Sequence, residues 1–200
     1  MGYELKVILA SRNQGKIREL TKILRPLKFD LASQKDYDIE SPEETGLTFI
    51  ENALIKAREV SEKSGLPSIA DDSGISVPML DGAPGIYSAR YAGDSCDDDQ
   101  NNEKLINALS NIADKSAFYY CVMVFVKHAL DPTPLIGVGE WHGSIVAEKR
   151  GSNGFGYDPH FWLAGYQCTA AELSPETKNQ ISHRAIASKM LMEALKSNKA

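Results

Sequence analysis

Apolar residues follow two different spacings along the chain, and these spacings predict a mixture of strands and helices. The apolar run at residues 6–10 predicts a short buried strand, and the polar segment 11–15 predicts a loop. Apolar residues then recur at helical spacing, at Ile17, Leu20, Ile23 and Leu24, until Pro26 stops the helix. The chain is therefore expected to open with a strand, a loop and a helix.

A second helix is expected after a polar link. Thr48 and Glu51 have capping-box spacing, Gly65 and Pro67 end the pattern, and the apolar side is formed by Ile50, Ala53, Leu54, Ala57 and Val60. The sequence Asp-Asp-Ser-Gly at 71–74 follows, and it is typical of a turn leading into strand-like residues 75–77.

The second half of the chain carries the most strand-like stretch, residues 117–126, which is apolar or aromatic on both alternations. Before it, residues 97–99 place negative charge at the start of a helix around Leu105, Ile106 and Leu109. After it, residues 136–146 suggest paired strands, and a closing helix is predicted from Ala185, Ile186, Met190, Ala194 and Leu195. Glycine-rich loops are expected at 82–93 and 151–156. The mixture predicts an α/β fold around one mixed sheet.

Composition limits the possible functions. With 200 residues and 42% hydrophobic residues, the chain is expected to form one domain over residues 1–200, with room for two lobes. A net charge of -5 argues against stable nucleic-acid binding, and no apolar run is long enough for a signal peptide or a membrane span. Three widely separated cysteines fit reduced thiols in the cytosol better than a disulfide framework or a zinc site.

The loop between the first strand and helix is a candidate phosphate-binding segment, formed by Ser11, Arg12, Asn13, Gln14, Gly15 and Lys16. Free backbone N–H groups and the helix dipole favour an anion at such a position, and Lys16 adds a full charge. The segment is not a Walker A loop, because Ala10 and Ile17 stand where that motif needs glycine and Ser or Thr. Taken alone, the segment is better described as a capped helix with a surface lysine.

Four carboxylates are candidate ligands for Mg²⁺, a hard ion that takes oxygen ligands: Glu43, Glu44, Asp71 and Asp72. Because adjacent extended residues point to opposite faces, one of Asp71 and Asp72 is expected to face a cleft while the other stabilises the turn. Asn52 and Lys56 are one helical turn apart and either reach jointly into a groove or are solvated, with solvation favoured.

Two further segments combine unusual chemistry. Residues 154–158 place Phe155 between two glycines, which suits stacking on a base, although a turn with an incidental aromatic gives the same pattern. Ser182 is a natural N-cap for the last helix, which leaves Arg184 at the helix end that disfavours a cation. His183 and Arg184 are therefore either placed for an electron-rich ligand or exposed at little cost.

Six segments, taken together, closely resemble the inosine triphosphate pyrophosphatase family, also called the non-canonical purine nucleoside triphosphate pyrophosphatases, and especially its bacterial members. They are Ser-Arg-Asn-Gln-Gly-Lys at 11–16, residues 43–53, 70–74 and 82–91, Gly-Phe-Gly-Tyr-Asp-Pro at 154–159, and Ile-Ser-His-Arg at 181–184. Each segment is modest alone, but all six in this order make a specific signal along nearly the whole chain.

The resemblance implies an elongated α/β fold with a groove between two lobes, a homodimer in the cytoplasm, and Mg²⁺ as cofactor. It implies that ITP, dITP, XTP and dXTP are hydrolysed to the monophosphate and pyrophosphate, which keeps deaminated purines out of DNA and RNA. The matching positions imply that residues 11–16 bind the phosphates, and they assign the other roles as follows: Glu44 and Asp72 to Mg²⁺, Asp72 also to catalysis, Ser73 and Lys56 to the substrate, and Phe155, Gly156, Tyr157, Asp158, Lys178, His183 and Arg184 to the base pocket. Ser88 is a further candidate contact.

Two positions depart from the family pattern: Arg12, where relatives often have a small residue or His, and His160, where an aliphatic residue is usual. Arg12 either tightens phosphate binding or points to solvent, and His160 is expected to be a strand side chain. The general-base and metal-ligand roles of Asp72 compete, because a bound metal lowers the proton affinity of a carboxylate.

Three other functions remain as alternatives: a triphosphate sensor without hydrolysis, an enzyme that removes only the terminal phosphate, and a pyrophosphatase of pyrimidine nucleotides. Glu44 and Asp72 argue against the sensor, because a sensor has no need of a metal-bound water near the α-phosphate.

Overall fold

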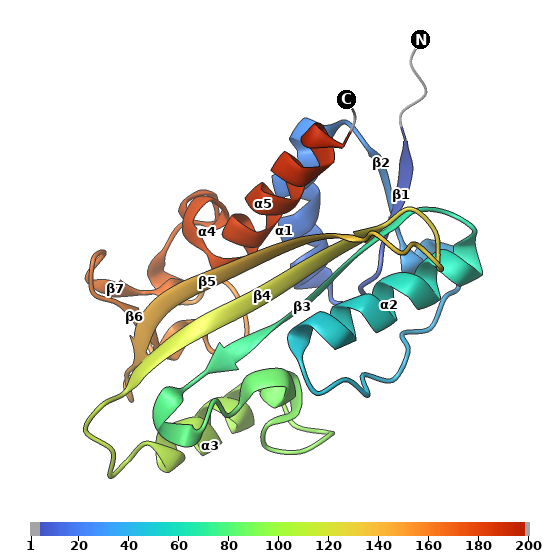
Figure 1. The fold of residues 1–200 in the computed structure, drawn as a ribbon. Coiled ribbons are helices and arrows are strands. Elements are labelled where there is room, and N and C mark those ends of the chain that lie inside the picture. Colours follow the sequence, from blue (N-terminus) through green and yellow to red (C-terminus); the bar gives the residue numbers. More distant parts are fainter. Residues whose placement is uncertain (1–4, 199–200) are drawn as a thin grey trace. The chain divides into compact units, whose positions relative to one another are not determined.

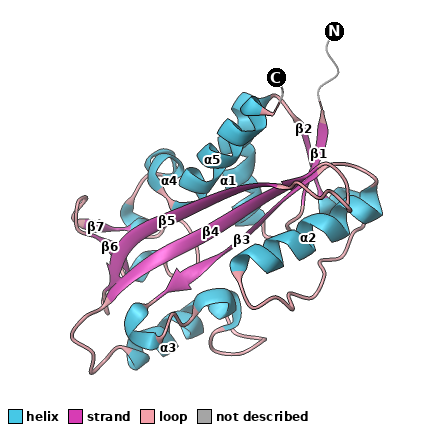
Figure 2. Cartoon of the chain, in the orientation of Figure 1, coloured by secondary structure: helices cyan, strands magenta, loops and turns pink. Residues whose placement is uncertain are grey.

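The computed structural model of the protein describes residues 5–198. Its strands and helices follow one another in the order that Figures 1 and 2 show. They are β1 (Lys6–Leu9), α1 (Gln14–Leu24), β2 (Asp30–Ser33), α2 (Phe49–Ser64), β3 (Ser68–Ser76), α3 (Asp98–Ala108), β4 (Ser116–Val126), β5 (Leu135–Ile145), β6 (Phe161–Leu163), β7 (Cys168–Thr169), α4 (Pro175–Ile181) and α5 (His183–Ser197). No helix within the described part of the chain is both long and apolar enough to cross a bilayer.

The strands form one seven-stranded mixed sheet with the order β2-β1-β3-β4-β5-β6-β7. β1 runs parallel to β2 and β3, whereas β6 runs antiparallel to β5 and β7. β4 lies in the middle of the order, as its two-sided apolar pattern predicts. The expected α/β fold with a mixed sheet and flanking helices is confirmed.

Capping residues in the sequence predicted several helix ends correctly. Asn13 accepts a hydrogen bond from the backbone N–H of Lys16 and caps α1, and Thr48 caps α2 through the N–H of Glu51. Gly65 ends α2 in the left-handed conformation, with φ 68°. Asp97 forms a capping box at the start of α3, as its charge suggested. β2, β6, β7 and α4 are too short to show a pattern in the sequence.

The predicted turn at 71–74 is wrong, because these residues lie inside β3. A side chain at Gly74 would collide with the carbonyl oxygen of Gly85 and the hydroxyl of Ser88, so glycine serves a close approach and not a turn. The paired strands predicted at 136–146 are one long strand, β5. Gly137 lies in this strand without interrupting it, because its bare Cα allows the carbonyl oxygen of Ala187 to approach.

Two other local expectations need correction. The glycine-rich segment 82–93 contains a 3₁₀ helix, Gly85–Arg90. His160 ends a short 3₁₀ helix, Asp158–His160, and is not a strand residue. It is buried, and its Nδ1 lies 3.0 Å from the carbonyl oxygen of Val146, which accounts for a buried imidazole without a role in chemistry.

Contacts between Cα atoms divide the described chain into two compact units. The first comprises residues 5–72, 121–139 and 184–198, and the second comprises residues 73–120 and 140–183. β3, β4 and β5 therefore each contribute residues to both units. The three cysteines are free, as expected.

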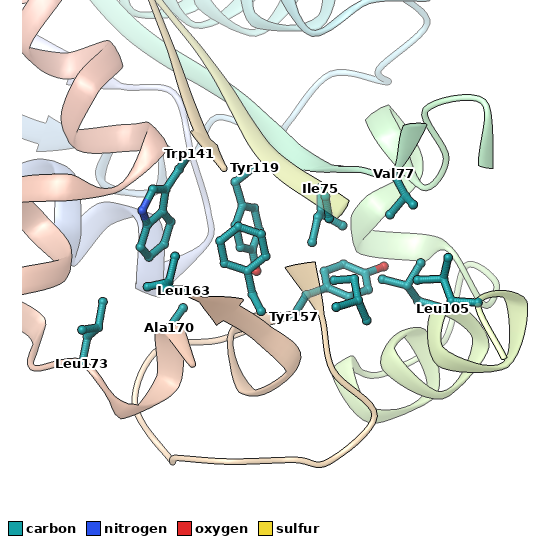
Figure 3. Packing of buried hydrophobic residues seen from close by; sticks show 13 residues of the cluster. Ile75, Val77, Leu105, Tyr119, Trp141, Tyr157, Leu163, Ala170 and Leu173 are labelled. Atoms are coloured by element: carbon teal, nitrogen blue, oxygen red, sulfur yellow. The ribbon is translucent and has the colours of Figure 1, made fainter. Parts of the chain in front are cut away.

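Each unit has its own apolar core. In the first, α1 and α5 lie side by side in Figure 1 and pack on the strands through Leu20, Leu24, Ala187, Leu191, Cys121 and Met123. In the second, aromatic and aliphatic side chains pack together, as Figure 3 shows for Tyr119, Trp141, Tyr157, Ile75, Leu105 and Leu163. The first core is mainly aliphatic, whereas the second is rich in aromatic rings.

Candidate active site

The candidate phosphate-binding loop lies between β1 and the first turn of α1, as predicted. Ser11 Oγ accepts a hydrogen bond from the N–H of Asn13 at 3.2 Å, and Asn13 Oδ1 accepts one from the N–H of Lys16 at 3.1 Å. These two bonds shape the loop at the positive end of the helix dipole. Gln14 and Gly15 form the first residues of the helix. The arrangement is suited to an anion.

Lys16 is held by a buried carboxylate. Its Nζ lies 3.1 Å from Oδ2 of Asp71, whose side chain is fully buried. The same oxygen lies 3.2 Å from the guanidinium of Arg184, which also pairs with Glu19 at 2.5 Å. Asp71 therefore joins a lysine of α1 to an arginine of α5, and Arg184, which the resemblance assigns to the base pocket, is engaged in two ion pairs.

The surroundings of Asp71 keep it ionised. Burial alone would raise its pKa, but Lys16, Arg184 and Lys56 outweigh that effect and hold the pKa well below its usual range. Arg184 occupies the second position of α5, where the dipole disfavours a cation. Its two carboxylate partners explain how a buried arginine is tolerated there.

The second cation of this region joins both predicted metal ligands. Lys56 Nζ lies 2.8 Å from Oε1 of Glu44 and 2.8 Å from Oδ1 of Asp72. Lys56 and Asn52 are buried, so the expectation that they are solvated is wrong. Asn52 Oδ1 accepts a hydrogen bond from the N–H of Gly46 at 2.8 Å, which fixes the segment next to Glu44. We call Lys16, Lys56, Asp71, Asp72 and Arg184 the carboxylate cluster.

Asp72 differs from Asp71 in its proton affinity. Burial raises the pKa of Asp72, and the opposing effects of Lys56 and Lys16 do not cancel this rise. For Lys56, burial lowers the pKa, but Asp72, Glu44 and Asp71 together raise it, so the amine stays protonated. The neighbouring carboxylates thus have opposite properties: Asp71 is a fixed anion, and Asp72 is the better proton acceptor.

Glu44 and Asp72 fit a Mg²⁺ ion. Within residues 5–198, Oδ2 of Asp72 is buried and has no hydrogen-bond partner, so one carboxylate oxygen is available as a ligand. The same residues contain no group of three or more His, Cys, Asp or Glu side chains placed to hold a metal alone. Mg²⁺ is commonly held in proteins by one or two carboxylates together with substrate phosphates and water.

Arg12 does not point freely into solvent. Its guanidinium pairs with Oε2 of Glu40, and both side chains remain substantially exposed. An exposed pair of this kind contributes little to stability. Arg12 thus lies in the candidate phosphate-binding loop with its guanidinium paired to Glu40.

The second unit fixes the glycine loop at 154–158 through one buried carboxylate. Asp158 Oδ2 accepts hydrogen bonds from the N–H of Phe155 at 3.0 Å and from Nζ of Lys178 at 2.6 Å. Lys178 Nζ also lies 5.0 Å from the centre of the Phe155 ring. Gly154 has φ +80°, and any Cβ there would collide with Asp158. The predicted residues of this loop and Lys178 are therefore brought together.

Tyr119 joins this group to His183. Its hydroxyl donates to Oδ1 of Asp158 at 3.2 Å, and its ring stacks on the imidazole of His183 at 4.6 Å with an angle of 7° between the planes. Burial and the Asp158 charge raise the pKa of Tyr119 well above its usual value, so the hydroxyl remains a donor. We call Tyr119, Phe155, Asp158, Lys178 and His183 the aromatic cluster.

Helix α3 holds the middle of the glycine loop. Asp98 Oδ2 accepts from the N–H of Gly156 at 2.7 Å, and Asn102 Nδ2 donates to the carbonyl oxygen of Gly156 at 2.9 Å. Tyr157, a predicted base contact, is buried and donates its hydroxyl to the carbonyl oxygen of Ser88 at 2.8 Å. A surface hollow of about 700 Å³ borders this loop and is lined by Asp97, Asp98, Asp99, Lys149, Phe155 and Gly156.

The other two predicted contacts lie near the start of the second unit. Ser88 uses its hydroxyl within the fold, because Oγ accepts from the N–H of Ile75 at 2.9 Å and donates to the carbonyl oxygen of Gly85 at 2.6 Å. It therefore shapes the backbone around Gly74. Ser73 follows Asp72 directly in β3 and is partly exposed.

Sequence reasoning missed several partners of the predicted residues. Glu19 pairs with Arg184 from 165 positions away, and Tyr119 bonds Asp158 across 39 positions. No local spacing marks such pairs. Asp98 was assigned to the helix start only, whereas its side chain also binds Gly156.

Comparisons with known proteins agree with the resemblance to pyrophosphatases. A family model described as the Ham1 family matches residues 7–194. The dITP/XTP pyrophosphatase of Photorhabdus laumondii is 51% identical, with 96% of this chain and 98% of that protein aligned. The dITP/XTP pyrophosphatase of Vibrio cholerae is 49% identical over 95% of this chain and 96% of its own.

Solved structures give the same result. A HAM1 protein from Coxiella burnetii is 44% identical, with a TM-score of 0.90 over 96% of this chain and 99% of its own. The Ham1 protein of Staphylococcus aureus is 40% identical, with a TM-score of 0.85 over the same shares. The similarity thus extends over both compact units.

Proposed function

The chain belongs to the Ham1 family, and from this premise we propose that it hydrolyses non-canonical purine nucleoside triphosphates between the α and β phosphates. The substrates are ITP, dITP, XTP and dXTP, and the products are the nucleoside monophosphate and pyrophosphate. The names of the relatives that share about half of its residues, dITP/XTP pyrophosphatases, support this substrate class. The activity would remove deaminated purines before they enter DNA and RNA.

One observation carries the chemical part of the proposal: Lys56 Nζ is held 2.8 Å from both Glu44 and Asp72, beside a carboxylate oxygen without a partner. A sensor that only binds triphosphates has no need of a buried carboxylate pair held in this way. Such a pair is suited to hydrolysis, because it places a proton acceptor and negative ligands next to a cation.

The residues of the carboxylate cluster divide the reaction between them. Asp72 accepts a proton from a water molecule, whose oxygen forms a bond to the α-phosphorus. The bond from the α-phosphorus to the bridging oxygen breaks, and pyrophosphate leaves with its electron pair. Lys16, at the start of α1, neutralises charge on the phosphate oxygens, and Asp71 keeps Lys16 in place. Burial raises the pKa of Asp72, which favours its role as the proton acceptor, whereas a Mg²⁺ ion bound to the same carboxylate would oppose this effect.

The proposed metal is Mg²⁺, and Glu44 and Asp72 are its protein ligands. When bound, the ion neutralises charge on the phosphates and orients them. Substrate oxygens and water would complete the coordination, as is usual for Mg²⁺ held by two carboxylates. Lys56 contacts both carboxylates and limits their mutual repulsion while the ion is absent.

The aromatic cluster is proposed to read the base. Hypoxanthine carries an oxo group where adenine carries an amino group, so the N–H groups of Lys178 and His183 favour the deaminated base. Phe155 offers a ring for stacking. A site whose donors are left unpaired by the wrong base discriminates by about 10⁴ or more, whereas shape alone gives about 10².

The proposal also includes a homodimer and a cytoplasmic location, both on the strength of the family resemblance. The net charge of -5 supports a small-molecule substrate in preference to a nucleic-acid backbone. The three free cysteines are compatible with a reducing compartment.

One test identifies both the phosphate bond that is cleaved and the base that is preferred. The purified protein is incubated with Mg²⁺ and ITP, XTP, GTP or ATP in separate reactions, and pyrophosphate, orthophosphate and monophosphate are quantified. Rapid pyrophosphate release from ITP and XTP is expected, with ATP and GTP nearly untouched. Asp72→Asn is expected to lower kcat by about 10²–10⁴ and serves as the negative control. Orthophosphate as the first product would assign attack to another phosphorus, and binding without products would favour a sensor.

A further inference from the structure

The hydroxyl of Tyr119 is one of three donors that converge on the carboxylate of Asp158. The other two, the N–H of Phe155 and Nζ of Lys178, both donate to Oδ2, whereas Tyr119 donates to Oδ1. The side chains of Tyr119, Asp158 and Lys178 are each at least nine-tenths buried. A buried carboxylate whose two oxygens are both bonded is fixed in rotation as well as position.

The ring of Tyr119 is fixed independently of its hydroxyl. Phe161 contacts it edge-on with ring centres 4.7 Å apart, and Trp141 stacks at 6.2 Å. Figure 3 shows Tyr119 in the middle of this packed region, between Trp141 and Ile75. The face of the ring then carries the imidazole of His183 at 4.6 Å, nearly parallel. A ring confined in this way holds whatever stacks on it.

We propose that Tyr119 is a positioning residue for base recognition, which aligns Lys178 and Phe155 through Asp158 and aligns His183 through its ring. The inference rests on the proposed function, because it concerns the residues assigned to the base. Tyr119 has a part in recognition without contacting the base. It joins the glycine loop to the residue that precedes Arg184, two segments that are separate in the sequence.

The chemistry of the phenol suits this role. Burial and the neighbouring Asp158 keep its pKa well above the usual value, so the hydroxyl keeps its proton and remains a hydrogen-bond donor at neutral pH. Asp158 then stays an acceptor for Lys178 and Phe155. Loss of the hydroxyl removes the bond that holds Oδ1 of Asp158, and the loop and Lys178 gain rotational freedom.

The test compares two conservative variants of neighbouring residues on β4. Tyr119→Phe removes the hydroxyl and keeps the ring, and Tyr120→Phe makes the same change on the opposite face of the strand, where the ring packs edge-on against Phe118. For each protein, kcat and KM are measured for ITP and ATP, and thermal unfolding is recorded. Tyr119→Leu, which also removes the stacking surface, is a second variant.

Tyr119→Phe is expected to lower the ratio of kcat/KM for ITP over ATP about tenfold, mainly through a higher KM for ITP. Tyr120→Phe is expected to keep the wild-type ratio. Tyr119→Leu is expected to lower the ratio more than Tyr119→Phe does. A purely structural role would lower the unfolding temperature and leave the ratio unchanged. A ratio within about twofold of wild type for Tyr119→Phe, or equal losses in Tyr120→Phe, would overturn the inference.

The two proposals fail separately. If the wild-type protein releases no pyrophosphate from ITP, the proposed function is overturned. If the wild type releases pyrophosphate and prefers ITP, but Tyr119→Phe keeps that preference, the function stands and only the role of Tyr119 is refuted.

Discussion

The carboxylate cluster and the aromatic cluster both bury charge, but they stabilise it in different ways. In the carboxylate cluster, Asp71 is surrounded by Lys16, Arg184 and Lys56, and the balance of attraction keeps it ionised. In the aromatic cluster, one ion pair between Lys178 and Asp158 lies among rings, and directed hydrogen bonds complete it. The first depends on several opposite charges, and the second depends on shape and hydrogen-bond geometry.

This difference fits the roles that we propose for the two clusters, which are to bind the phosphates and the base of a nucleotide. A triphosphate presents strong negative charge on a chain with free torsions, and cations held by carboxylates can bind it by exchanging partners. A base presents little charge and a defined edge, so its recognition requires donors fixed by packing. It follows that a substitution in the carboxylate cluster destabilises the protein mainly by leaving a charge unpaired. A substitution in the aromatic cluster has its effect mainly by displacing side chains.

The largest effect is expected from Arg184→Ala, which tests the first half of the comparison. The change removes a buried partner of Asp71 and Glu19, at 3.2 and 2.5 Å. Removal of one member of a buried ion pair costs about 3–5 kcal/mol, because the opposite charge is left without compensation. The free energy of unfolding, measured in urea, is expected to fall by this amount.

Arg18→Ala provides the matched control for that measurement. Arg18 precedes Glu19 in α1 and is exposed, so its loss is expected to change the unfolding free energy by at most about 0.5 kcal/mol. If Arg184→Ala cost less than about 1 kcal/mol, Asp71 would not depend on Arg184, and the first cluster would not be held by balanced charge.

An intermediate effect is expected from Gly74→Ala in the second unit, where packing is the proposed determinant. A methyl group there would meet the carbonyl oxygen of Gly85 and the hydroxyl of Ser88, and the backbone of Gly85 cannot rotate away as a side chain can. Overpacking of this kind costs about 1–3 kcal/mol, which urea unfolding would detect. Gly165→Ala, with no atom within 4 Å of the new methyl group, is the control. Equal unfolding free energies of the two variants would show that the second unit tolerates displacement of the backbone around Gly85.

The same contrast explains which features the sequence predicts. The strand, loop and helix around Lys16 follow from local spacing and an N-cap, so they were predicted correctly. The spacing of Asn52 and Lys56 placed them on one helix face, but only the position of Glu44 and Asp72 makes that face buried. Local rules thus identified the residues and not their environment.

Two failures have a physical reason. The segment 71–74 has turn composition, yet Gly74 is required by the close approach of Ser88, a contact that exists only after folding. Arg184 was expected to be either placed for a ligand or exposed, and the exposed alternative is wrong, because Arg184 is buried and pairs with Asp71 across 113 positions. Tertiary contacts decide both cases, and neither leaves a periodic signal in the chain.

The smallest effect on stability is expected from a change at Cys121. This change tests whether water reaches the interior beside the carboxylate cluster. Burial, with a contribution from Asp71, raises the pKa of this thiol from 9.0 to about 12. The folded protein therefore holds the thiol proton more tightly than the unfolded chain. The resulting stability is complete below pH 9 and is lost as the pH rises toward 12.

Unfolding free energies of wild type and Cys121→Ala, measured at about pH 8.5 and about pH 10, isolate this contribution. The wild type is expected to lose about 1 kcal/mol more than the variant over that interval, because the unfolded thiol ionises while the folded thiol does not. Cys96→Ala, which removes a thiol outside the carboxylate cluster, should follow the wild-type slope. If the unfolding free energies of wild type and Cys121→Ala changed equally with pH, water would reach this thiol. The charges beside the thiol would then be strongly screened by water. Their balance could not determine the ionisation of Asp71.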